Sequence, residues 1–501
     1  MPSSNRSLPK RVLDLWDHLG NPATEVVKLL EVQGNISADY VALSHCWGPP
    51  GSVFKTTKET LDEHMLGIKL KDLSPTFQDA ITITLKLGIQ YIWIDSLCII
   101  QNDKPDWETE SSKMADIYSN CTLAVAATGS DSSEGGCLFD RWTRERGLKT
   151  LKGPMALKIS GREGEIEVYV QPRSHYSHIF PYSDPGDGPQ SALLRRAWAF
   201  QERILAPRII HFHHEELVWE CRTVAACECG ALNPTLQKEK GHRWALKRTF
   251  NEITEKISHF ETSPLDFWME TIAYFSRMLI TNETDRLPAL AGIAGRLSTS
   301  LQNGYLAGLW RSELAKLLCW YRCPASIAGK LRYVRTARDP NIPSWSWASL
   351  KPDEAGTSQP IYFEKGLVVD KGLNILDASC GVSEANIFGN VSGGSIRIRG
   401  AVFAAKIAHC HSSGILLWHD IVSGCCGNAK KLGELILDIS CEQKIIPTCE
   451  DISCLILGNQ VGTDVALVIR NVRGDQFERV GLFLLEKMNL VETKYMTLTL
   501  I

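Results

Sequence analysis

The sequence predicts an α/β protein with an N-terminal three-layer β-α-β core, a mixed and mainly helical middle region, and a β-rich C-terminal region. Three observations predict this order. Short apolar runs alternate with amphipathic helical patterns over residues 38–130. Helical spacing dominates residues 243–320. Beyond about residue 355 the chain becomes glycine-rich, and polar and apolar residues alternate as in strands.

The first strong element is an apolar strand over Tyr40–Cys46, which ends in a Trp-Gly-Pro-Pro-Gly turn. Ser74 and Pro75 then suit the N-cap and first position of a helix, and Gly88 supplies its C-terminal stop. A second apolar strand covers residues 91–95. A strand, a crossover helix and a strand in this order predict a parallel pair.

The next helical segment carries one carboxylate on its apolar face. At about 100° per residue, Met114, Ile117 and Tyr118 share one stripe with Trp107, and Glu110 falls inside that stripe. A buried charge is costly unless it is paired, protonated or functional. Glu110 is therefore a candidate catalytic residue or a structural group that pairs with an interior arginine or binds backbone N–H groups near the helix start.

A short strand over Cys121–Ala127 completes the predicted core. Residues before the core look like a leader with one short helix around Val26 to Val32. The predicted organisation is a leader at 1–37, a domain at 38–210 with its α/β core at 38–130 and a strand-rich extension, a mainly helical region at 211–354, and a β-rich region at 355–501.

Composition limits the partners of this chain. The net charge of −3 and a pI near 6.5 provide no basic field for nucleic acid or an anionic membrane. The N-terminus lacks an apolar signal region, and no apolar run reaches the length of a membrane span. We expect a cytoplasmic protein. The 16 cysteines lack the short regular spacings of a disulfide framework, which favours reduced thiols.

One group of histidines and cysteines has the residue types of a zinc site. It comprises His211, His213, His214, Cys221, Cys227 and Cys229. Its C-x5-C-x-C spacing is not a standard zinc pattern, and the alternation around Phe212 is typical of a strand with one solvated face. We therefore predict no metal site from the sequence.

Several sequence blocks resemble, in the same order, those of the fungal heterokaryon incompatibility (HET) domain. They are Tyr40–Gly48, Leu73–Ile81, Tyr91–Gln101, Asp106-Trp107 with Glu110, and Met114 with Ile117-Tyr118. Five later blocks resemble the pattern that follows this domain in many family members. They are Arg196–Arg208, Leu217–Cys221, Asp285–Leu290, Gly308–Trp310 and Pro343–Ala348. The resemblance covers about residues 39–349 and leaves out the β-rich tail.

This resemblance implies a fungal, cytoplasmic protein of allorecognition and programmed cell death. It also implies a TIR-like or flavodoxin-like core, because the family has been compared with Toll/interleukin-1 receptor (TIR) domains, some of which cleave NAD. Trp107-Glu-Thr-Glu110 matches the Trp-x-x-Glu of TIR enzymes, whose glutamate is catalytic. The connection from the strand at 91–95 to this helix is much shorter than in an ordinary TIR domain.

The resemblance would make Glu110 the catalytic residue of an NAD nucleosidase, where a carboxylate stabilises an oxocarbenium-like sugar. NAD would be the substrate, and no cofactor is implied. The candidate binding residues are Ser44, His45, Trp47, Asp95 and Trp107. The polar ones end two neighbouring strands, where α/β sheets bind ligands, and the tryptophans would stack on nicotinamide or adenine. Backbone hydrogen bonds, capping and core packing are the structural alternatives.

Arg195, Arg196 and Arg203 offer another role for buried carboxylates. They would either bind an anion such as a pyrophosphate or pair with Glu110 and Glu202 as structural ions.

Three functions remain open at this point. The first is a death-inducing protein that consumes a nucleotide such as NAD after self-association. The second is a non-catalytic module that recognises a partner incompatibility protein, with Glu110 structural. The third is a HET-type protein recruited to a secondary-metabolite biosynthetic pathway.

Overall fold

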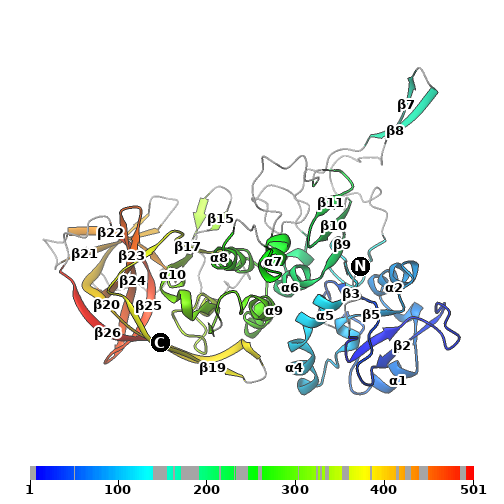
Figure 1. The fold of residues 1–501 in the computed structure, drawn as a ribbon, viewed down its shortest axis with the longest axis horizontal. Coiled ribbons are helices and arrows are strands. Elements are labelled where there is room, and N and C mark those ends of the chain that lie inside the picture. The colour runs from blue at the N-terminus through cyan, green and yellow to red at the C-terminus, as the bar shows by residue number, and fades with distance from the viewer. Residues whose placement is uncertain are drawn as a thin grey trace. The chain divides into compact units, whose positions relative to one another are not determined.

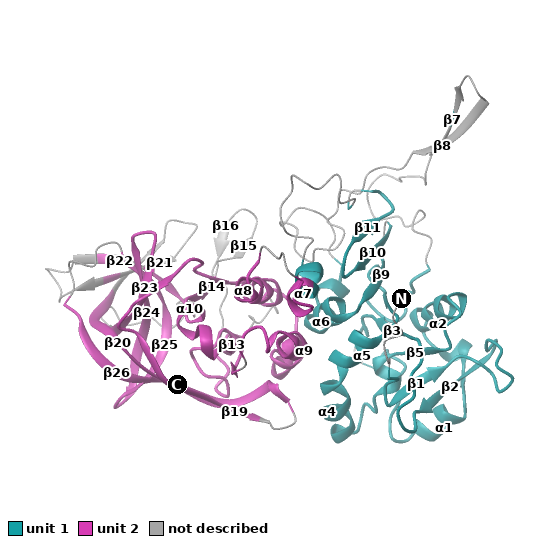
Figure 2. Ribbon diagram, viewed as in Figure 1, with its two compact units in different colours: residues 1–251 teal, residues 252–501 magenta. Residues whose placement is uncertain are grey.

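A computed structural model describes most of the 501 residues. The described residues are 7–49, 51–138, 155–161, 164–170, 191–213, 216–230, 232, 246–257, 262–302, 304–322, 325–327, 330–332, 338–351, 360–383, 386–412, 417–423, 430–438, 450–485 and 492–501. The chain forms two compact units, residues 1–251 and 252–501 (Figures 1 and 2).

Unit 1 is built on a nine-stranded mixed sheet. Its strand order is β11-β10-β9-β6-β3-β5-β1-β2-β4. The strands are β1 (Arg11–Asp14), β2 (Val26–Glu31), β3 (Tyr40–Ser44), β4 (Ile68–Lys69), β5 (Tyr91–Trp93), β6 (Leu123–Ala126), β9 (Arg208–Phe212), β10 (Leu217–Cys221) and β11 (Ala225–Cys227). The helices are α1 (Leu61–Leu66), α2 (Pro75–Lys86), α3 (Asp95–Cys98), α4 (Lys104–Ser112), α5 (Met114–Asn120) and α6 (Ala197–Leu205). The division between the units falls within α7 (Leu246–Thr254).

Four neighbouring strands at the centre of this sheet are parallel. The central strand β3 pairs with β5 on one side and β6 on the other, and β6 pairs with β9. The chain therefore leaves β3 toward β5 and returns past β3 to β6. This confirms the predicted parallel pair and places a change of winding direction at β3.

Helices cover both faces of the parallel strands. Parallel crossovers are right-handed, so two crossovers in opposite directions place their helices on opposite faces. Figure 1 shows α2 and α5 on opposite sides of β3 and β5. Side chains agree, since the Tyr40 hydroxyl donates to Ile117 O of α5 over 2.5 Å, whereas the ring of His45, on the alternate face, packs edge-on against Phe77 of α2. Together these observations confirm a mixed α/β core.

Two local predictions differ from the structure. The helix expected around Val26 to Val32 is wrong, because this segment is strand β2 and pairs with β1. Val27 and Leu29 are buried there and Val26 and Lys28 are exposed, a period-two pattern that the sheet stabilises. The helix predicted across Glu110 is divided into α4 and α5 at Lys113.

The apolar stripe nevertheless keeps its predicted phase across this break. Glu110, Met114, Ile117 and Tyr118 are all buried, while Glu108 on the other side of α4 is exposed. A separate antiparallel pair, β7 (Met155–Gly161) and β8 (Gly164–Val170), includes the strand expected near residue 164.

Unit 2 combines a helical part with a large sheet. Its helices are α8 (Pro264–Phe275), α9 (Pro288–Leu297) and α10 (Leu314–Leu317). The short strands are β12 (Tyr305–Leu306), β13 (Leu309–Trp310), β14 (Trp320–Arg322), β15 (Ala325–Ile327), β16 (Lys330–Arg332), β17 (Ile361–Phe363) and β18 (Val368–Val369). The long strands are β19 (Asn374–Ser383), β20 (Asn386–Ser412), β21 (Leu417–Ser423), β22 (Lys430–Leu437), β23 (Glu450–Gln460), β24 (Thr463–Arg473), β25 (Gln476–Leu485) and β26 (Lys494–Leu500).

The long strands confirm the β-rich C-terminal region. Because β20 pairs with both β21 and β23, the strands β20, β21, β22, β25, β24 and β23 close into a ring. Phe403, Cys454 and Phe483 lie in the apolar cluster that these strands form. Closure satisfies the strand edges that an open sheet would expose.

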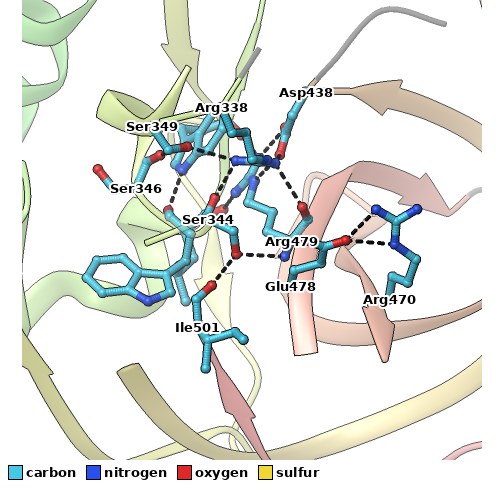
Figure 3. Close-up of polar contacts among 12 residues, drawn as sticks. Arg338, Ser344, Ser346, Ser349, Asp438, Arg470, Glu478, Arg479 and Ile501 are labelled. Atoms are coloured by element: carbon cyan, nitrogen blue, oxygen red, sulfur yellow. Dashed lines mark hydrogen bonds and ion pairs between the residues drawn. The ribbon is translucent and has the colours of Figure 1, made fainter. Parts of the chain in front are cut away.

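A buried ionic cluster connects this sheet to the Pro-Ser-Trp-Ser-Trp segment within unit 2 (Figure 3). Asp438 accepts hydrogen bonds from Arg479 Nε at 2.9 Å and from Arg338 Nη2 at 2.7 Å. Arg479 also donates to Leu318 O over 2.6 Å, and its guanidinium lies 3.5 Å from the ring centroid of Trp320. These contacts join residues on both sides of residue 355.

Among the described residues, no helix combines the length and the apolar character needed to cross a membrane.

Candidate functional site

The candidate site lies at the carboxyl ends of β3 and β5. Ser44 is the last residue of β3 and His45 follows it, and because side chains alternate along an extended chain they point to opposite faces of the sheet. Asp95 follows β5 after one residue, Ile94, and is the first residue of α3. Since β3 and β5 are parallel neighbours, their ends meet at one edge, as predicted. The winding direction of the sheet also changes at β3, because the chain goes from β3 to β5 on one side and then to β6 on the other. Such switch points are where α/β sheets bind ligands.

Ser44 contacts a carboxylate that comes from a distant part of the chain. Its hydroxyl donates a hydrogen bond to Glu202 Oε2 of α6, and both residues are buried. The contact with α6 explains the polar residue at the end of an otherwise apolar strand. The carboxylate that Ser44 bonds to is therefore Glu202 and not Glu110.

Glu202 has an altered acidity in this environment. Burial raises the pKa of Glu202 to about 7, the hydrogen bond from Ser44 opposes the rise, and the Asp95 carboxylate adds to it. Arg196 and the hydroxyl of Tyr118 lower the pKa of Glu202 in turn. A carboxyl group that titrates near neutral pH is suited to proton transfer.

His45 and Asp95 form the second half of the cluster. His45 Nδ1 lies 3.7 Å from Asp95 Oδ1, and Trp47 Nε1 donates to Asp95 Oδ2 over 2.8 Å. Burial lowers the pKa of His45 to about 4, although Asp95 opposes this shift. His45 is therefore neutral at pH 7. Its Nε2 atom is buried and has no hydrogen-bond partner among the described residues.

Arg196 supplies positive charge at the same edge. Its Nη1 donates to the backbone oxygen of His45 over 2.6 Å, and its side chain is half-buried. Burial raises the pKa of the adjacent Cys46 thiol, while Arg196 acts against that rise. Cys46 is thus held as a neutral thiol, and the guanidinium of Arg196 is the group suited to a phosphate.

Two loops come together beyond the strand ends. Gly48 has a φ of +91°, and a Cβ atom at this position would lie 2.7 Å from Ser132 Cβ. Ser133 Oγ donates to Trp47 O over 3.3 Å. The absence of a side chain at Gly48 therefore lets the turn after β3 approach the loop after β6 and leaves Trp47 half-buried at the edge.

Glu110 lies apart from this cluster in its polar contacts. Among the described residues its carboxylate bonds to Lys113 Nζ at 2.9 Å, one helical turn away. Only 1% of Glu110 is exposed, so the predicted burial is confirmed. Trp107 is half-buried on α4, and the described contacts do not join it to Ser44 or His45. The catalytic role of Glu110 stays a prediction.

The arginine pairings also differ from the sequence prediction. Arg203 binds Glu220 rather than Glu110 or Glu202, with Nε to Oε2 at 2.8 Å and Nη2 to Oε1 at 3.1 Å. Arg196 remains near Glu202. Sequence reasoning named Glu202 only as an ion-pair partner. Its position before Arg203 on a helix that is buried almost throughout is the signal that could have singled it out.

These features define an α/β domain with a buried polar cluster at the carboxyl edge of its parallel strands. Residues 40–202 match the family model described as heterokaryon incompatibility protein (HET). Residues 40–202 are therefore a HET domain, which confirms the resemblance seen in this part of the sequence. The match begins with Tyr40 of β3 and ends at Glu202. No curated protein and no solved structure gives a significant match.

Proposed function

We propose that this chain acts in heterokaryon incompatibility and regulated cell death in the fungal cytoplasm, and that its HET domain hydrolyses a nucleotide such as NAD. The proposal rests chiefly on Glu202, a buried carboxyl group at a sheet edge whose pKa burial raises to about 7. The parallel order β5-β3-β6-β9 supports it, because flavodoxin-like sheets with this winding bind nucleotides at the corresponding edge. TIR-like NAD cleavage is the related chemistry.

The cluster offers a role for each part of the substrate. Arg196 would bind the pyrophosphate, and Trp47 would stack on a base. His45 Nε2 would accept a hydrogen bond from a ribose hydroxyl. Glu202 would stabilise the oxocarbenium-like ribose and take a proton from the attacking water.

The reaction is a hydrolysis and needs no other reactant. Water attacks C1′ of the nicotinamide-bearing ribose, and the bond between C1′ and the nicotinamide nitrogen breaks. Its electron pair stays on nicotinamide, and the proton lost by water passes to the carboxylate and then to solvent. The products are nicotinamide and ADP-ribose.

The test compares four purified full-length proteins: wild type, Glu202→Gln, Glu110→Gln and Glu108→Gln. Each is incubated with NAD at high protein concentration while nicotinamide release is followed. We expect Glu202→Gln to lower the rate at least about 100-fold, a usual loss for an acid–base or electrostatic group. Glu108 is exposed on α4, and its variant is the control for Glu110→Gln.

The outcomes show whether Glu202 or Glu110 is the catalytic carboxylate. Loss of release in Glu110→Gln, with activity kept in Glu202→Gln, would assign catalysis to Glu110. No release by wild type, even when the protein is forced to oligomerise, would end the nucleotidase proposal.

A non-catalytic recognition module is the second candidate. The observation that favours it is that Ser44 bonds to Glu202 and Trp47 bonds to Asp95 within the cluster, so the cluster also serves to fix the strand ends. The partner would then be an incompatibility protein or a second copy of this chain. Hyphal killing by Glu202→Gln and by Glu110→Gln at the wild-type level would support this candidate. A role in a secondary-metabolite pathway rests on the sequence alone.

A further inference from the structure

We propose that Glu216, Cys227 and Cys229 form a zinc site at the outer end of the β9–β10–β11 hairpins. This site is separate from the carboxyl-edge cluster and independent of the function proposed above. One ligand atom of each residue lies within 4.8 Å of those of the other two. The two sulfur atoms are 3.4 Å apart.

Strand pairing brings these three residues together. Glu216 immediately precedes β10, and Cys227 ends β11. Because β10 and β11 are antiparallel, with Val218 opposite Cys227, the end of β11 lies beside the start of β10. Cys229 follows two residues later, and its backbone N–H donates to Glu216 Oε2 over 2.8 Å. The carboxylate is thereby aimed at the same place as the thiols.

The chemistry of the three ligands favours zinc over a hard cation. Thiolates select soft or borderline metals, and zinc accepts a carboxylate as a further ligand. With Zn–S bonds of about 2.3 Å, a tetrahedral ion sets two sulfurs about 3.8 Å apart, close to the 3.4 Å separation here. A water molecule would complete the tetrahedron.

The surrounding backbone suits a metal thiolate. Leu232 N–H donates to Cys227 Sγ over 3.3 Å, and a hydrogen bond of this kind orients a ligand atom toward a metal. Gly230 has a φ of +73° and donates to Cys227 O over 3.1 Å, which turns the chain tightly around the sulfur. Glu216 is 2% exposed, and a divalent ion keeps a buried carboxylate and two thiolates deprotonated together.

The structure divides the histidines and cysteines that the sequence groups together. His211 Nδ1 lies 3.1 Å from Thr128 Oγ1, and the Cys221 sulfur lies 3.3 Å from Thr223 Oγ1. Cys221 pairs with Arg208 at the far end of β10. The inferred ion would tie Glu216, immediately before β10, to the end of β11, an edge strand of the nine-stranded sheet.

The test measures metal binding by the full-length protein. After chelation, wild type is titrated with Zn²⁺ and, separately, with Co²⁺, whose near-ultraviolet charge-transfer bands report thiolate ligands. We expect Cys227→Ser/Cys229→Ser to bind one zinc fewer per chain than wild type and to lack the thiolate bands. Glu216→Gln should keep these bands and bind Zn²⁺ at least tenfold more weakly. The matched control, Cys221→Ser, should behave like wild type.

Thermal unfolding gives a second readout, in which Zn²⁺ should raise the Tm of wild type and of Cys221→Ser but not of the double variant. The proposal is overturned if wild type binds no zinc, if the double variant binds as much as wild type, or if bound cobalt shows no thiolate bands. A Cys227–Cys229 disulfide that persists in the zinc-treated, reduced protein would also overturn it. The cobalt spectrum of wild type decides the question even if the double variant does not fold.

Discussion

At the carboxyl end of β3, Ser44 and His45 point to opposite faces of one sheet. Burial shifts the pKa of Glu202, the partner of Ser44, and the pKa of His45 in opposite directions. Burial raises the pKa of Glu202, which bonds to Ser44, to about 7. It lowers the pKa of His45 to about 4. In both residues desolvation favours the neutral form. In the candidate site, Glu202 is therefore the group that gains or loses a charge near physiological pH.

Glu202 should make the folded protein less stable as pH rises. Its folded pKa of about 7 lies above the ordinary 4.5, so its stabilising contribution is complete below pH 4.5 and disappears as pH rises through 7. The shift corresponds to about 3 kcal/mol. We expect the stability of wild type relative to Glu202→Gln to fall by about this amount from pH 5 to pH 8, as measured by urea unfolding.

The comparison with Glu202→Gln is needed because His45 titrates with the opposite sign. Its folded pKa is depressed from 6.5 to about 4, so its contribution is present above 6.5 and disappears as pH falls. Because wild type and Glu202→Gln both contain His45, the difference between their stabilities reports the contribution of Glu202 alone. Parallel stability curves for the two proteins from pH 5 to pH 8 would contradict the altered acidity of Glu202.

At the scale of elements, a buried ion pair joins the first strand to the helix that carries Glu110. Arg11 of β1 donates to Asp106 of α4, and the side chains are 2% and 6% exposed. Lys10 Nζ and the backbone N–H of Ile100 each lie 3.0 Å from the same carboxylate. The residues before β3 are thus part of the sheet, and they hold α4 in place.

Asp106→Asn should destabilise unit 1 by about 3 kcal/mol, because it leaves Arg11 buried without its counter-charge. Burial raises the pKa of Asp106, but Arg11, Ile100 and Lys10 outweigh burial and bring the pKa to about 2. This contribution is therefore complete above about pH 4 and is lost as pH falls toward 2. Urea unfolding at pH 7 and pH 3 measures both effects.

The control for this variant is Glu108→Gln on the same helix. Glu108 is 59% exposed and lies 3.7 Å from Lys104, so its loss should change stability by less than about 1 kcal/mol. Equal effects of the two substitutions would show that the Arg11–Asp106 pair does not stabilise the fold.

At the scale of the whole molecule, unit 2 spans the composition change near residue 355. Asp438, 1% exposed, binds Arg479 of β25 and Arg338. Arg338 in turn donates to Ser344 O over 2.7 Å, and Ser344 N donates to Ile501 O over 3.1 Å. The β-rich sheet and the Pro-Ser-Trp-Ser-Trp segment are therefore expected to unfold together.

Asp438→Asn should destabilise unit 2 by about 3 to 5 kcal/mol, since two arginines lose a buried counter-charge. Hydrogen exchange followed by mass spectrometry should show faster exchange throughout residues 252–501 and little change in residues 1–251. The control is Glu478→Gln, which removes the more exposed contact with Arg470 and should change stability by less than about 1 kcal/mol. If Asp438→Asn showed faster exchange only in the β-rich strands, this result would contradict the expectation that unit 2 unfolds as a whole.

The local features of this protein could be predicted from its amino-acid sequence. Apolar runs and a capped helix located β3, α2, β5 and β6, and helical phase identified the burial of Glu110, because these depend on neighbours in the chain. The HET resemblance was also available from sequence blocks in order. The polar groups that end β3 and β5 were predicted from the rule that parallel strand ends share an edge.

The contacts between residues far apart in the chain could not be predicted in this way and are known from the fold. Glu202 reaches Ser44 across 158 positions, Arg11 reaches Asp106 across 95, and Arg479 reaches Asp438 across 41. Val26–Glu31 became a strand because β1 was there to pair with it. Local pattern cannot specify such pairs, since their stability comes from desolvation and from partners that only folding brings together.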